Sequence, residues 1–308
     1  MTKHFSTLFA AALLSSISAL AMTDPLVVPG FYVEWPFHNG LPTMVEIRRK
    51  VEDITSPFQH IQMFETTEFG NMLVIDDVIM LTSRDNAGYH EMIAQVPLNA
   101  HPNPQKVLVI GGGDGGTITQ VCKHAGVKEI FMCEIDAEVI KMSKKYFPEF
   151  AASFDDPRVT VVAEDASKYI KKHPGEFDVI IVDSTDPFGP GAALFTQEFY
   201  SDLHAALSED GIATTQSESQ FLYTDLIGKL YKQNKALFEY TGYYYTLVPT
   251  YPSGTIGFSF CSKKYNPFEH LNADRIRSLG KMDYYNEAMH RSSFQLPQFM
   301  LDRLGLSQ

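Results

Sequence analysis

The 308-residue sequence is poor in cysteine and tryptophan and has no excess of positive charge. Its three cysteines, Cys122, Cys133 and Cys261, lie among apolar residues, so they predict buried thiols and argue against a disulfide framework or a cysteine metal site. Lysine and arginine total 25 against 37 aspartates and glutamates. The resulting net charge of -12 argues against a nucleic-acid partner and suits a protein that handles small cations.

The sequence has one long apolar run, and it lies at the N-terminus. Residues 1–21 carry Lys3, then a mostly apolar stretch, and end Ala-Leu-Ala, which resembles a secretory signal peptide. The run is too short and too rich in serine for a membrane span. Two more interpretations stay open: Met22 is the true start of the protein, or the segment is an organellar address. We leave it out of the fold prediction.

Beyond residue 21 the pattern of apolar and polar residues divides the chain into two parts. Residues 22–83 contain short β-branched and aromatic runs separated by turns, which predicts a small β domain. In residues 84–308 helical segments alternate with apolar runs, which predicts a Rossmann-like, doubly wound α/β sheet closed by an antiparallel pair. The expected strands are residues 44–51, 59–65, 72–75, 78–82, 107–110, 129–136, 159–163, 177–183, 211–216, 243–248 and 255–261. The expected helices are residues 86–98, 117–124, 137–146, 166–172, 196–207 and 222–238.

The stretch KVLVIGGGDGG at residues 106–116 is the centre of the second part. Its apolar run is typical of a strand buried on both faces. Gly111, Gly112 and Gly113 then allow a tight turn and leave room for a ligand. A strand, a glycine loop and a helix start together predict a nucleoside-binding corner.

The next strand specifies the kind of nucleoside. Glu134 lies about twenty residues past the loop, where a carboxylate accepts hydrogen bonds from ribose hydroxyls. The loop fits a dinucleotide fingerprint poorly, because Asp114 places negative charge where a pyrophosphate would bind. That charge would attract a cation instead. A nucleoside with a positive group, such as a sulfonium nucleoside, is the better prediction.

Acidic residues follow several of the expected strands, where ligands bind in such sheets. Five carboxylates at one edge would repel one another unless a cation compensated them. Within the loop DSTDPFGPG the two aspartates can bind an ammonium group and accept its proton. The acids concerned are Asp114, Glu134, Asp165, Asp183 and Asp186.

Several motifs together resemble the polyamine aminopropyltransferase family, most of all the spermidine synthases. They are GGGDGG, CEID, DSTDP, TYPSG at residues 250–254, Arg84-Asp85 with YHEM at residues 89–92, and Tyr284-Tyr285-Asn286. The resemblance implies a methyltransferase-like sheet behind an N-terminal β domain, in a homodimer or homotetramer. It also implies transfer of the aminopropyl group of decarboxylated S-adenosylmethionine, a co-substrate, to putrescine, giving spermidine and 5′-methylthioadenosine without a cofactor or metal.

The resemblance further implies roles for individual residues. Asp183 matches the proton acceptor. The positions that match the nucleoside donor site are Gln59, Glu134, Asp165, Ala166 and Pro190, with Gly111 and Gly113 in the glycine loop. The positions that match amine-binding residues are His90, Asp114 and Asp186, with Tyr89, Tyr251, Gln216 and Gln220 lining the channel.

The chain departs from the family pattern at Asp77, Met80, Asn86 and Gln95, most of which we place at the gate between the domains. The acceptor therefore stays open among putrescine, cadaverine, agmatine and spermidine. Three further functions compete with aminopropyl transfer: a putrescine N-methyltransferase, which Asp114 disfavours, a non-catalytic polyamine-binding paralogue, and an exported polyamine-binding protein. We expect a cytoplasmic protein with small-molecule substrates and no membrane partner, because the donor is made inside cells.

Overall fold

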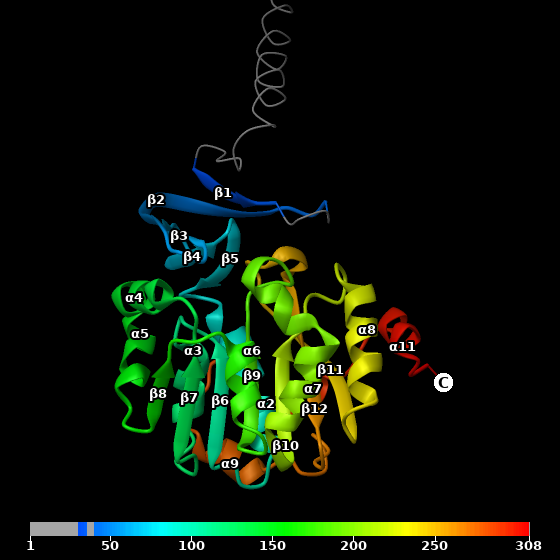
Figure 1. Cartoon of the computed structure of the whole chain (residues 1–308). Coiled ribbons are helices and arrows are strands. Elements are labelled where there is room, and N and C mark those ends of the chain that lie inside the picture. Colours follow the sequence, from blue (N-terminus) through cyan, green and yellow to red (C-terminus); the bar gives the residue numbers. More distant parts are fainter. Residues whose placement is uncertain (1–29, 36–39, 308) are drawn as a thin grey trace, which may run out of the picture.

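The computed structural model describes residues 30–35 and 40–307, so the segment 1–21 lies outside the described part. A small antiparallel sheet lies above a larger mixed sheet with helices on both faces (Figure 1). None of the described helices is long and apolar enough to span a membrane.

The small sheet is a meander in which each strand pairs with the next in the chain. Its β4–β5 turn places Asp76 and Asp77 at positive φ, 47° and 67°, as a tight hairpin turn requires. One face packs on helices α4 (Ala137–Tyr146) and α5 (Pro148–Ala151) through Met63, Leu73 and Met142, among others. The strands are β1 (Phe31–Glu34), β2 (Thr43–Thr55), β3 (His60–Thr66), β4 (Asn71–Ile75) and β5 (Val78–Thr82).

The large sheet has seven strands in the order β11-β12-β10-β9-β6-β7-β8. Five strands are parallel, and β11 and β12 close one side as the expected antiparallel pair. The strands are β6 (Lys106–Gly111), β7 (Glu129–Cys133), β8 (Val159–Val162), β9 (Phe177–Asp183), β10 (Leu207–Gln216), β11 (Tyr240–Leu247) and β12 (Thr255–Ser262).

Helices cover both faces of this sheet, which explains the continuous apolar run of β6. Val107 and Val109 pack toward α2 and α3, whereas Leu108 and Ile110 pack toward α6, α7 and α8. The helices are α2 (Asn86–Ala100), α3 (Gly116–Cys122), α4 (Ala137–Tyr146), α5 (Pro148–Ala151), α6 (Ala166–Tyr169), α7 (Gln197–Ala206), α8 (Thr224–Lys235), α9 (Ala273–Ser278), α10 (Glu287–Ser292) and α11 (Gln298–Leu304), with the 3-10 segment η3 (Gly189–Phe195). The predicted doubly wound fold with a small β domain is confirmed, although the helix expected over 222–238 is shorter.

The order of the strands fixes where a ligand can bind. From β6 the chain builds outward through β7 and β8, then returns to place β9 on the other side of β6. The loops after β6 and β9 therefore diverge, and a crevice opens between them at the carboxyl ends of the strands. Gly111 and Asp183 are register partners at this point.

Candidate active site

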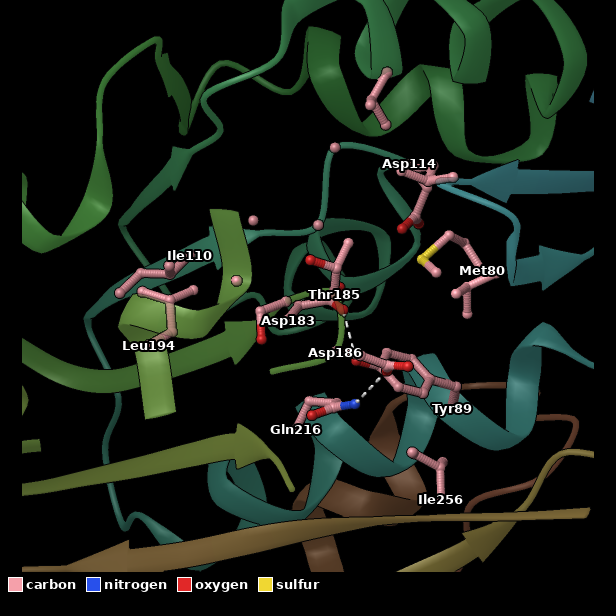
Figure 2. A pocket seen from close by; sticks show the side chains of 18 of the residues that line it. Met80, Tyr89, Ile110, Asp114, Asp183, Thr185, Asp186, Leu194, Gln216 and Ile256 are labelled. Carbon is pink, nitrogen blue, oxygen red and sulfur yellow. Dashed lines mark hydrogen bonds between the residues drawn. The ribbon is translucent and has the colours of Figure 1, made fainter. Parts of the chain in front are cut away.

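A pocket lies at this crevice, with β4 and β5 of the small sheet as its other wall. Figure 2 shows Asp114, Asp183 and Asp186 around it, with Met80 and Tyr89 beside them. The lining includes these predicted site residues: Gln59, Tyr89, His90, Gly111, Gly113, Asp114, Glu134, Asp165, Ala166, Asp183, Asp186, Gln216 and Tyr251.

The glycine loop brings the ends of β6 and β9 into close contact. Gly111 has a φ of +74°, and a Cβ there would lie 2.1 Å from the carbonyl oxygen of Asp183. The next residue, Gly112, donates its N–H to that carbonyl at 2.9 Å. A side chain at residue 111 would separate the two strand ends, so glycine is required there to bring Asp114 and Asp183 to one side of the pocket.

Asp114 forms a buried ion pair with His90 of α2. The Nε2 of His90 lies 3.0 Å from Oδ1 of Asp114, which also accepts the N–H of Gly116 at 2.6 Å. Burial alone would lower the pKa of His90, but the charge and hydrogen bond of Asp114, together with the nearby charge of Asp183, outweigh it and the pKa lies above its ordinary value. Burial opposes ionisation of Asp114 too, yet the His90 contact holds its pKa below the ordinary value. The imidazole rests against Gly116, where a Cβ would meet it at 2.2 Å.

Asp183, the predicted proton acceptor, is a buried carboxylate held by two hydroxyl groups. Tyr89 donates to Oδ1 at 2.7 Å and Thr117 of α3 donates to Oδ2 at 2.7 Å. Burial, and after it the charge of Asp114, raises the pKa of Asp183 to about 6. A carboxylate with this pKa is ionised at neutral pH and still basic enough to take a proton.

His90, Asp114 and Asp183 form a compact cluster, which could not be recognised as a cluster from the sequence. One ligand atom from each of His90, Asp114 and Asp183 lies within 4.8 Å of the others. The sequence shows no such cluster by metal-ligand spacing, because residues from α2, the glycine loop and β9 are far apart in the chain. The cluster suits a cation, whether a metal ion or an ammonium group.

A second acidic cluster surrounds Asp186. Gln216 donates to Asp186 at 3.4 Å (Figure 2) and to Oε1 of Glu218 at 3.2 Å. Burial and then the charge of Asp186 raise the pKa of Glu218 well above its ordinary value, and burial raises that of Asp186 to about 6. Glu34, at the end of β1, accepts the N–H of Ile79 at 2.7 Å, and burial raises its pKa to about 8. The second end of the pocket therefore gathers three buried carboxyl groups whose ionisation is opposed, and within the described residues none of them forms an ion pair.

Glu134 lies at the opposite side of the pocket from this second cluster, after β7. Its carboxylate accepts the N–H of Gly113 at 3.1 Å and that of Asp136 at 2.8 Å. Burial raises its pKa to about 7. Two donors fix the carboxylate at the pocket wall and leave lone pairs for the hydroxyls of a ribose. Asp165 instead caps its own helix, accepting the N–H and the hydroxyl of Ser167.

A hydrogen bond between the two domains fixes Gln59 near the loop that carries Glu134. The hydroxyl of Ser56 donates to Asp136 at 2.6 Å and accepts the N–H of Gln59 at 3.0 Å. Asp136 also caps α4 by accepting the N–H of Glu138. The turn before β3 is thus fixed to the loop that carries Glu134.

Sequence reasoning missed Glu34, Glu218 and Thr117. Of the four departures from the family pattern, most of which it placed at the gate, Gln95 is not a gate residue. Gln95 lies in the core, where its Oε1 is 2.7 Å from Nε2 of His124. Gln220 is buried but does not line the pocket. The side chain of Pro190 lies outside the described part of the structure, and its predicted role stays a prediction.

Two family profiles match the chain in sequence. The "Spermine/spermidine synthase domain" matches residues 86–271, and the "Spermidine synthase tetramerisation domain" matches residues 35–83. Proteins named polyamine aminopropyltransferase are also similar. That of Leptospira biflexa is 45% identical over 261 residues, 85% of this chain and 92% of the relative. That of Thermotoga petrophila is 40% identical over 278 residues, 90% of this chain and 94% of the relative.

Solved structures of spermidine synthases resemble the chain in fold. A spermidine synthase in complex with the transition-state analogue AdoDATO superposes with a TM-score of 0.87 at 38% identity, covering 94% of this chain and 100% of that one. The spermidine synthase of Thermotoga maritima gives a TM-score of 0.86 at 38% identity, covering 94% and 99%.

Proposed function

This chain belongs to the spermine/spermidine synthase family and transfers aminopropyl groups in polyamine biosynthesis, and we propose that its acceptor is putrescine and its proton acceptor Asp183. The donor is then decarboxylated S-adenosylmethionine, used as a co-substrate, and the reaction needs no further cofactor. The products are spermidine and 5′-methylthioadenosine.

The observation that carries the choice of a diamine is the pair of acidic ends in one pocket. His90, Asp114 and Asp183 form one end, and the cluster around Asp186 forms the other. With the amino end of the donor at Asp114, a diamine places one ammonium group at Asp183 and the other at the Asp186 cluster, whereas a monoamine reaches only one of them. Two buried clusters therefore favour an acceptor that carries charge at both ends.

The geometry supports a role for each group in the reaction. Glu134 holds the ribose, and Asp114 with His90 holds the amino end of the aminopropyl group. Asp183 takes a proton from the near ammonium of the acceptor, which frees a nitrogen lone pair. That nitrogen attacks the carbon bonded to the sulfonium, the carbon–sulfur bond breaks, and its electrons stay on sulfur as a thioether. Because the sulfonium is already a good leaving group, the enzyme mainly positions the reactants.

A product assay tests this proposal. Protein beginning at Met22 is given decarboxylated or intact S-adenosylmethionine with putrescine, cadaverine, agmatine or spermidine, and the products are identified by mass spectrometry. Spermidine with 5′-methylthioadenosine is the expected result. Another aminopropylated amine would contradict the choice of putrescine. A methylated amine would contradict the roles given to Asp114 and Asp183.

We propose a homo-oligomer in the cytoplasm, with small molecules as the substrates and no nucleic-acid partner. The similarity of residues 35–83 to a tetramerisation domain supports the oligomer, and the site of donor synthesis supports the compartment. Light scattering on the purified protein distinguishes dimer from tetramer, and a monomer would contradict the proposal. Fractionation of cells that express the full chain tests the compartment.

A further inference from the structure

Asp85 precedes α2 at the position where an aspartate usually caps a helix, yet its carboxylate makes no capping hydrogen bond. Its Oδ1 accepts the hydroxyl of Thr82 at 2.5 Å. Its Oδ2 accepts the N–H of Thr250 at 3.0 Å and the hydroxyl of Thr250 at 2.8 Å. The carboxylate thus joins the end of β5 to a loop 165 residues further along the chain. We call these three residues, Thr82, Asp85 and Thr250, the Asp85 clamp.

The loop that the Asp85 clamp holds carries part of the pocket wall. Tyr251 follows Thr250 directly and donates its hydroxyl to the carbonyl of Met80 in β5. Its ring centroid lies 6.2 Å from that of Tyr89, which in turn donates to Asp183. Met80, Tyr89 and Tyr251 all line the pocket. The position of Thr250 therefore fixes the position of Tyr251 in the wall of the pocket.

The clamp lies away from the groups that hold the nucleoside. Residues 250–254 connect β11 to β12, on the β10 side of the junction between β6 and β9. Glu134 and Asp165 follow β7 and β8, on the other side of that junction. A small displacement of the loop would move Tyr251 and leave the nucleoside contacts in place.

We propose that Asp85 is a positioning residue for the amine acceptor: by holding Thr250, it fixes Tyr251 between the two domains and sets the width of the acceptor channel. This rests on the proposed function, in which a diamine occupies the pocket beside Tyr251. Asp85 does not touch the substrate. It acts through the hydrogen bonds to Thr250, so its loss raises the KM for the acceptor and leaves the KM for the donor unchanged.

The test compares Asp85→Asn and Thr250→Val with the matched control Thr246→Val. Thr246 is equally buried and donates to the carbonyl of Gly88 at 2.9 Å in the same junction, but it is not part of the clamp. Loss of one buried hydrogen bond corresponds to a change of about tenfold. We expect the KM for the acceptor to rise by about tenfold in both clamp variants and the KM for the donor to change less than about twofold. The control should leave both KM values within about twofold.

Hydrogen–deuterium exchange of residues 248–256 provides a readout that needs no substrate. It should be faster in both clamp variants than in the control, because the amide of Thr250 loses its acceptor or its fixed position. A parallel rise in both KM values, or a loss of kcat alone, would overturn the proposal. Unchanged exchange with an unchanged acceptor KM would do so too. If the wild-type protein prefers another diamine, the choice of putrescine fails, and the clamp is still tested with the amine that is used.

Discussion

Replacing Asp183 with asparagine should abolish aminopropyl transfer and at the same time stabilise the ligand-free protein at pH 8. The carboxylate is buried and receives hydrogen bonds from Tyr89 and Thr117. Even so, burial and the charge of Asp114 raise its pKa from 3.8 to about 6. The ionised carboxylate that the proposed reaction needs is therefore unfavourable for the folded state.

The size of the effect follows from the pKa. The folded carboxyl binds its proton more tightly than the unfolded one, so stability is lost as pH rises from about 4 to about 6, and the full cost is present above pH 6. At about 1.4 kcal/mol for each tenfold change in the acid constant, the cost is about 3 kcal/mol at pH 8. Asparagine avoids this cost but weakens the two hydrogen bonds, which offsets about 1–2 kcal/mol. The net gain of roughly 1–2 kcal/mol corresponds to an increase in Tm of a few degrees.

Thermal unfolding at pH 5 and pH 8, at one protein concentration and without amines, measures this gain. The Tm difference between Asp183→Asn and wild type should be positive at pH 8 and close to zero or negative at pH 5. Asp156→Asn is the control, for which we expect a Tm below that of wild type. Hydrogen bonds from Arg158 hold the pKa of Asp156 below its ordinary value, so its loss should destabilise the protein equally at both pH values.

Two results would refute this reasoning. A Tm difference for Asp183→Asn that is the same at pH 5 and pH 8 would show that the buried charge imposes no cost on the fold. Aminopropyl transfer at the wild-type rate in this variant would show that another group accepts the proton. Binding of 5′-methylthioadenosine should survive the substitution, and its loss would mean that the variant is disrupted more widely.

Three further substitutions separate the functions of the pocket. Tyr89→Phe removes a hydrogen bond that lowers the pKa of Asp183. The acidic limb of the plot of kcat/KM against pH should therefore shift from about pH 6 to higher pH, and an unshifted limb would contradict Asp183 as the proton acceptor. Asp114→Ile should raise the KM for the decarboxylated donor about 100-fold and the Kd for 5′-methylthioadenosine less than about threefold, whereas equal losses would make Asp114 structural. Ser56→Ala should weaken nucleoside binding about fivefold in calorimetry and leave the acceptor KM unchanged, since Ser56 fixes Gln59 and Asp136.

The part of the site that follows the strands of the parallel sheet could be predicted from the sequence. Gly111 and Asp183 each end an apolar run, and the carboxyl ends of parallel strands meet at one edge. The same rule, extended to β10, points to Glu218, which comes two residues after the last residue of that strand, Gln216. The sequence therefore carries a signal for Glu218 as well.

Glu34 could not be found in this way. It ends a strand of the small sheet, and no local pattern fixes how that sheet lies over the large one. Packing of Met63 and Leu73 on α4 and α5 sets that orientation, and only then does Glu34 face Asp186. The orientation of one domain on another depends on the packing of two surfaces, and the sequence pattern of a single segment does not predict it.

Gln95 shows how closeness in sequence misleads on a helix. It lies six residues after Tyr89 on α2, and six residues turn a helix by about 240°, so the two side chains leave on different faces. Tyr89 faces the pocket, and Gln95 faces His124 beyond α3. Burial lowers the pKa of His124 to about 3, so the ring is neutral and its Nε2–H donates to Gln95. The residue belongs to a core hydrogen bond and does not line the pocket.

The two acidic clusters connect stability with the choice of acceptor. Burial raises the pKa of Asp183, of Asp186 and of Glu34, so the pocket opposes ionisation at both ends. Protons relieve the repulsion at low pH, and a bound dication relieves it at high pH. A monoamine relieves only one end, and a diamine of the wrong length places its second charge away from Asp186. Under the proposed function, the burial of these carboxyl groups that weakens the ligand-free fold is therefore also what favours an acceptor with two charges at a fixed spacing.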